Sequence, residues 1–97
     1  MMYPIRLKTG FFETTPCTLS IQYEGVTLNS PGDKQKDIRV ARDDIIAVTI
    51  TIKRYPRFEI QTREKTISGT FSDEVDCGEL ERQFNECLGS KIFTEKG

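Results

Sequence analysis

Hydrophobic and polar residues alternate along the first two thirds of the chain, and this alternation has the period of a β-strand. Short apolar and β-branched runs are separated by turn residues every eight to twelve positions or so, a spacing typical of a β-sandwich or barrel. The runs predict seven strands, at about residues 3–8, 17–23, 26–30, 36–41, 45–53, 57–62 and 66–71. We therefore expect a mainly β, antiparallel fold.

The second and fifth runs show the alternation most clearly. In the second run, the residues expected to face the core are Cys17, Leu19, Ile21 and Tyr23. A tight turn at Glu24-Gly25 then leads into the third strand, which makes this pair a hairpin. In the fifth run, the residues expected to face the core are Ile46, Val48, Ile50 and Ile52. The loop before the second strand is expected to span Thr9 to Pro16.

The period changes to 3.6 after the seventh run, which predicts one helix at about residues 76–88. Asp76 followed by Glu79 is the spacing of a capping box, in which the Glu side chain reaches back to the amide of the cap residue. The apolar stripe of this helix consists of Leu80, Phe84, Cys87 and Leu88. Gly69 in the seventh run is expected to leave room for the helix. Gly89 ends the helix. In the tail after it, Ile92 and Phe93 can still pack, and the chain is then expected to fray.

Seven antiparallel strands closed by one amphipathic C-terminal helix resemble the pleckstrin homology (PH) superfold. Locally, the stretch DIRVARDDIIAVTI is similar to the passage from the fourth to the fifth strand of PH-like and GRAM-like domains, and FEIQTREKTISGTFSD is similar to their closing hairpin. The resemblance implies a single domain over residues 1–97, a bent sandwich or barrel with the helix plugging one end. It also implies an open rim formed by the loops after strands one, three and six.

Five basic residues lie at or near that rim if the resemblance holds: Lys8, Lys34, Lys36, Arg63 and Lys65. A positive rim can receive phosphate groups, although a solvated rim is the simpler interpretation. Phosphoinositide-binding members of the superfold carry a further basic residue on the second strand, and the corresponding segment here, CTLSIQY, has none. We therefore do not expect specific phosphoinositide recognition.

An aromatic doublet, Phe11-Phe12, follows Gly10 in the first loop. Adjacent residues of an extended segment point in opposite directions, so one ring is exposed if the chain is extended there. Alternatively, the loop folds over and buries both rings. An exposed ring would give the chain an apolar contact for a protein partner.

Composition limits the chemistry open to this chain. It has 97 residues, no histidine and only three cysteines, so catalysis through a histidine triad is excluded and neither a metal site nor a cofactor is expected. The net charge of −1 and a sequence pI near 5.5 do not favour nucleic-acid binding. No apolar run is long enough to span a membrane. With no secretion signal and few cysteines, we expect a cytoplasmic protein that is not an enzyme.

On these grounds we expect a non-enzymatic binding or adaptor module whose partner is another protein. Two alternatives stay open. The basic rim could bind an anionic lipid or phosphate weakly, or an exposed strand edge could pair with a second copy and make the chain a self-associating structural subunit.

Overall fold

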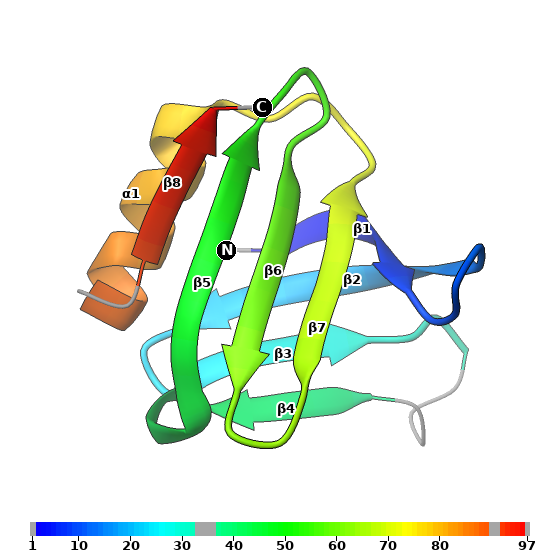
Figure 1. Ribbon diagram of the computed structural model, residues 1–97, viewed down its shortest axis with the longest axis horizontal. Helices are drawn as coiled ribbons and strands as arrows, with labels where there is room; N and C mark the ends of the chain where they lie inside the picture. Colours follow the sequence, from blue (N-terminus) through cyan, green and yellow to red (C-terminus); the bar gives the residue numbers. More distant parts are fainter. Residues whose placement is uncertain (1, 33–36, 90–91, 97) are drawn as a thin grey trace.

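A computed structural model describes residues 2–32, 37–89 and 92–96 of the chain. Figure 1 shows a strongly bent sheet with one helix beside it. The elements are β1 (Met2–Lys8), β2 (Thr14–Gln22), β3 (Gly25–Asn29), β4 (Ile38–Ala41), β5 (Ile45–Ile52), β6 (Arg57–Thr62), β7 (Thr66–Phe71), α1 (Cys77–Leu88) and β8 (Ile92–Lys96). The seven predicted antiparallel strands and the predicted helix are thus confirmed.

The strands form one continuous sheet in the order β4-β3-β2-β1-β7-β6-β5-β8. β1 joins the two halves, because it pairs along its whole length with β2 and through Ile5, Arg6 and Leu7 with β7. In Figure 1 the first four strands run across the direction of β5, β6 and β7, so the sheet folds over onto itself. The result is the bent sandwich implied by the sequence.

The core lies inside this bend and is covered at one end by α1. Three side chains of the predicted helical stripe, Leu80, Phe84 and Leu88, are at most 1% exposed. The sheet contributes alternate residues from both halves, among them Ile5, Leu19, Val48 and Ile60. Removing this apolar surface from water is the main source of the stability of such a domain.

The helix begins as predicted at Asp76, but only half of the capping box forms. The Asp76 carboxylate accepts from the backbone amides of Gly78 at 2.9 Å and Glu79 at 3.2 Å. The Glu79 side chain does not reach back to the cap. Instead it accepts from the Arg82 guanidinium at 2.6 Å, and this interaction lowers the pKa of the Glu79 carboxyl. A charged donor one turn along the helix is a stronger partner than a neutral amide.

The β1–β2 hairpin is longer than predicted. β2 starts at Thr14 and includes Pro16, which pairs with Arg6 of β1, whereas the sequence placed a loop there. Pro16 is tolerated because β3 pairs with β2 only from Thr18 onward, so the other side of the strand needs no amide donor at this point. The hairpin therefore projects beyond β3.

Two side chains expected in the core are at the surface. Tyr23 lies in the turn after β2 and is 67% exposed, with the Arg42 guanidinium 4.4 Å from its ring centre. Ile46 is 51% exposed because the pairing of β5 with β6 shifts register between Ile45 and Ala47, which puts Ile45 inside instead. A bulge of this kind turns one residue away from the face that simple alternation predicts.

Gly69 makes room for another side chain, not for the helix. A Cβ there would approach the Phe58 ring to 2.9 Å and the backbone oxygen of Arg6 to 2.6 Å. Phe58 of β6 therefore lies against the β7 backbone opposite Gly69, with which it is paired. The prediction that the helix uses this space is wrong.

Residues 92–96 of the tail form regular structure, whereas the sequence predicted fraying. Their backbone forms β8, which pairs in parallel with β5 from Val48↔Ile92 to Ile52↔Lys96 and becomes one edge of the sheet. Ile92 packs partly buried against the core. Five residues are too few to show a period, so the sequence did not reveal this strand.

Tyr3 of β1 is partly buried against the core, next to the N-terminal end of the helix. Its ring meets Phe71 edge to face at 5.5 Å, and its buried hydroxyl has no hydrogen-bond partner among the described residues. Burial, together with the negative charge of Glu79, raises the pKa of the Tyr3 hydroxyl above its ordinary value of 10.0.

The raised pKa predicts a loss of stability at alkaline pH. Below pH 10 the hydroxyl is protonated in both states; above it, the unfolded chain releases the proton first, so the free energy of unfolding falls as pH rises. Tyr3→Phe should abolish this contribution and, at neutral pH, leave stability unchanged or raise it by up to about 1 kcal/mol. Urea unfolding of both proteins between pH 8 and 11 measures this. If the free energies of unfolding of the two proteins changed with pH in the same way from pH 8 to 11, the raised pKa of Tyr3 would be contradicted.

Candidate functional site

The tip of the β1–β2 hairpin carries two exposed aromatic rings. The backbone amide of Thr9 donates to the Glu13 carbonyl oxygen at 3.0 Å and closes the loop, so Phe11 and Phe12 stand at its end. Phe11 is 84% and Phe12 is 92% exposed, and the rings meet edge to face with their centres 4.6 Å apart. The sequence left open whether one ring is exposed or both are buried. Both are exposed, because the hairpin projects past the sheet; we call this pair the Phe knob.

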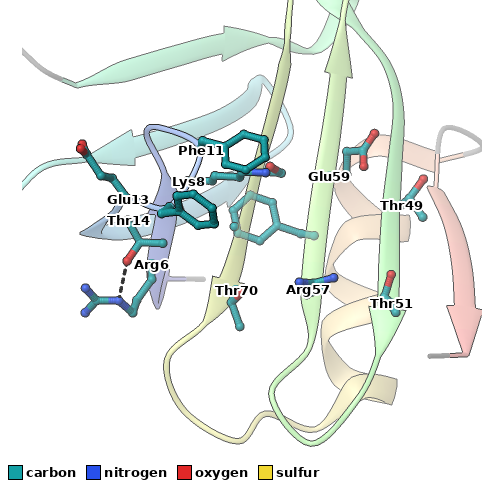
Figure 2. A pocket seen from close by; sticks show the side chains of 14 residues that line it. Arg6, Lys8, Phe11, Glu13, Thr14, Thr49, Thr51, Arg57, Glu59 and Thr70 are labelled. Atoms are coloured by element: carbon teal, nitrogen blue, oxygen red, sulfur yellow. Dashed lines mark hydrogen bonds between the residues drawn. The ribbon is translucent and has the colours of Figure 1, made fainter.

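Beside the Phe knob, a hollow of about 590 Å³ opens on the outer face of β5, β6 and β7. We call it the outer hollow. It is lined by Arg6, Lys8, Phe11, Phe12, Glu13, Thr14, Thr49, Thr51, Arg57, Phe58, Glu59, Ser68, Gly69 and Thr70. In Figure 2, Phe11 and Lys8 stand at one side of the hollow, and Glu59 and Thr49 lie on the strands across from them.

Strand alternation explains the polar floor of the outer hollow. Val48 and Ile50 of β5, like Phe58 and Ile60 of β6, point into the core. Their neighbours in sequence must point outward. The outward positions on the three strands carry the hydroxyls of Thr49, Thr51, Ser68 and Thr70 and the charges of Arg57 and Glu59. The floor therefore offers hydrogen bonds and charges, while the wall offers two aromatic rings.

The charged side chains around the outer hollow have few partners within the chain. Arg6 Nε donates to Thr14 Oγ1 at 3.0 Å, which braces the two strands of the hairpin (Figure 2). Lys8, Glu13, Arg57 and Glu59 take part in none of the ion pairs found among the described residues. Counting Arg6, three cations and two carboxylates thus face one hollow without neutralising each other at short range.

The basic rim suggested by the sequence is divided between two places. Lys8 lines the outer hollow, whereas Arg63 and Lys65 line a separate hollow of about 240 Å³ between β4 and the β6–β7 turn. The two hollows share no lining residue. Lys34 and Lys36 lie outside the described residues.

Sequence reasoning singled out the Phe doublet and Lys8, but not the floor opposite them. Thr49, Thr51, Ser68 and Thr70 are ordinary outward residues when each strand is considered alone. The available signal was that the two strands flanking β6 both place small hydroxyl residues on the same outward face, and it becomes visible only once the order β7-β6-β5 is known. Arg57 and Glu59 escaped notice for the same reason.

Within the part of the chain that the structure describes, His, Cys, Asp and Glu side chains form no group of three able to hold a metal ion. Over those same residues, no helix has the length and apolar character needed to cross a membrane.

Comparison with known proteins identifies the fold and goes no further. No family model matches the sequence, and no curated protein matches it. Among solved structures, one chain in the structure of the Spt16D Pob3N heterodimer is similar over 99% of this chain with a TM-score of 0.71 and 13% sequence identity. This chain spans about half of that one, 54% of its length. The similarity confirms the PH-like fold.

Proposed function

We propose that this chain with a PH-like fold is a non-enzymatic binding module that docks another protein through the Phe knob and the outer hollow. The observation that carries the proposal is the exposure of both rings, 84% for Phe11 and 92% for Phe12, at the wall of the outer hollow. An apolar pair held at the tip of a projecting hairpin has nothing to cover it within the described chain.

Energetics favour a partner that buries the Phe knob. Burying apolar surface is worth about 25 cal/mol per Å², and aromatic side chains dominate the energy of many interfaces. A polar surround that can be hydrogen-bonded is the usual complement to such an anchor. The hydroxyls of Thr49, Thr51, Ser68 and Thr70 supply that surround here.

A protein partner is better supported than an anionic one. Glu13 and Glu59 line the same hollow as Arg6, Lys8 and Arg57, so the site has an excess of only one positive charge. The remaining described rim cations, Arg63 and Lys65, line another hollow. The similar solved structure is that of a heterodimer, so the fold occurs in a protein that pairs with another. The absence of histidine from the sequence is in keeping with a role without catalysis.

Replacing Phe12 by Ser should weaken binding of a captured partner by about 2 kcal/mol, roughly thirtyfold, because it removes an aromatic anchor. The melting temperature should hardly change, since this ring is 92% exposed. Isothermal titration of the purified partner measures the first quantity, and thermal unfolding measures the second.

The matched control is Tyr23→Ser, which removes another exposed ring at the opposite end of β2 and away from the outer hollow. It should bind like the parent. Equal losses from both variants would contradict the proposal. So would binding to vesicles with anionic lipid that survives at physiological salt and does not depend on Phe12, since this would favour the anion-binding alternative.

A further inference from the structure

We propose that the occupant of the outer hollow is the Phe knob of a second copy of this chain, so that two copies exchange knobs about a two-fold axis. This inference rests on the proposed function, because it names the protein that binds the same site. It would make the chain a symmetric dimer.

The position of the Phe knob beside its own receiving surface allows a closed dimer. Phe11 and Phe12 line the hollow whose floor is β5, β6 and β7. Figure 2 shows Phe11 beside that floor. When knob and hollow are neighbours on one face, a two-fold axis between two copies can place each knob in the other's hollow. A knob on a different face from its hollow would instead favour head-to-tail contacts, which build rings or open chains of molecules.

The surface available is enough for a stable pair. An aromatic side chain can bury roughly 150–250 Å², and both rings of the Phe knob are almost fully exposed. Two knobs and the two surfaces that receive them would then remove roughly 1,200 to 2,000 Å² from water, which is the size of a typical specific interface. A single ring would not reach that size.

The charges around the hollow are complementary under the same two-fold exchange. The hairpin carries Lys8, Glu13 and Arg6, whose Nε donates to Thr14, and the floor carries Arg57 and Glu59. None of these five charged side chains is in an ion pair among the described residues. Placing one copy's hairpin over the other's floor lets Lys8 meet Glu59 and Glu13 meet Arg57, twice in each dimer. A net charge of −1 per chain adds little repulsion to the pair.

Charge reversal tests whether the hairpin of one copy lies over the floor of another. Sedimentation velocity of the full chain should show a dimer that Lys8→Glu and Glu59→Lys each weaken at least tenfold, because each change opposes like charges across both halves of the interface. An equimolar mixture of the two variants should restore the dimer, since both contacts then join opposite charges. The double variant should restore it too, and Phe12→Ser should weaken it about thirtyfold or more.

Both reversed side chains are exposed, so the variants should melt like the parent, and this is checked in the same samples. A parent chain that stays monomeric at several hundred micromolar would overturn the dimer, as would a mixture no more associated than its components. If that monomeric chain still binds a different protein through Phe12, the proposed function stands and only the second copy as its partner is refuted. If Phe12 contributes neither to dimerisation nor to binding of a different protein, both proposals fail.

Discussion

Replacing Phe84 by Ala is expected to lower the free energy of unfolding by about 3 to 5 kcal/mol, a large share of what a domain of this size possesses. Phe84 is fully buried in the middle of the helical stripe, between Leu80 and Leu88. The substitution leaves a cavity at the contact between α1 and the sheet, where close packing holds the helix over the open end of the core. Urea unfolding followed by circular dichroism measures the loss.

The same substitution at an exposed ring is the matched control. Phe11→Ala should change the free energy of unfolding by no more than about 0.5 kcal/mol, because that side chain is 84% exposed. Similar losses of unfolding free energy for Phe84→Ala and Phe11→Ala would mean that Phe11 is packed as closely as Phe84, which would contradict the exposed Phe knob.

Replacing Gly25 by Ala is expected to cost about 3 kcal/mol or more. Gly25 has a φ of +144°, which residues with a side chain rarely adopt, and a Cβ there would overlap the backbone carbonyl of Val40 on the neighbouring strand. Backbone strain and overpacking each cost about 1 to 3 kcal/mol, and the β4 backbone cannot withdraw without giving up its pairing with β3.

Gly32→Ala separates the two contributions. Gly32 also has a positive φ, +77°, but a Cβ there would meet nothing within 4 Å. It should therefore cost only about 1 to 2 kcal/mol, the strain of the left-handed backbone alone. Thermal and urea unfolding of both variants decide this, and a Gly25→Ala protein as stable as Gly32→Ala would show that β3 and β4 do not approach as closely as described.

Much of the fold was predictable because strand alternation and the helical stripe are dictated by burial on one side. The alternating apolar residues of a run such as Ile45–Ile52 predict a strand with one buried face, and the shift to a period of 3.6 after Phe71 marks the helix unambiguously. The wrong predictions arose where a local feature shifted the alternation of inward and outward residues along a strand. The bulge after Ile45 exposed Ile46, and the early end of β2 put Tyr23 in a turn. Alternation alone gives no sign of such a bulge.

The site was less predictable because it depends on which strands become neighbours. An aromatic doublet in a loop can be seen in the sequence, and Phe11 and Phe12 were singled out on that basis. Whether the loop buries them depends on how far the β1–β2 hairpin projects, which follows from where β3 stops pairing with β2. The hydroxyl floor gathers Thr49 and Thr70 from strands on either side of β6, so no local motif identifies it.

The proposal that the Phe knob is covered by a protein in the working state can be examined inside the cell. A photoreactive phenylalanine analogue at position 12 should form covalent adducts with protein on irradiation, identifiable by mass spectrometry, because the ring would lie within an interface. The same analogue at position 23, another exposed aromatic site outside the outer hollow, should form few. Adducts of equal yield and identity at both positions, or none at position 12, would contradict the assignment of this surface.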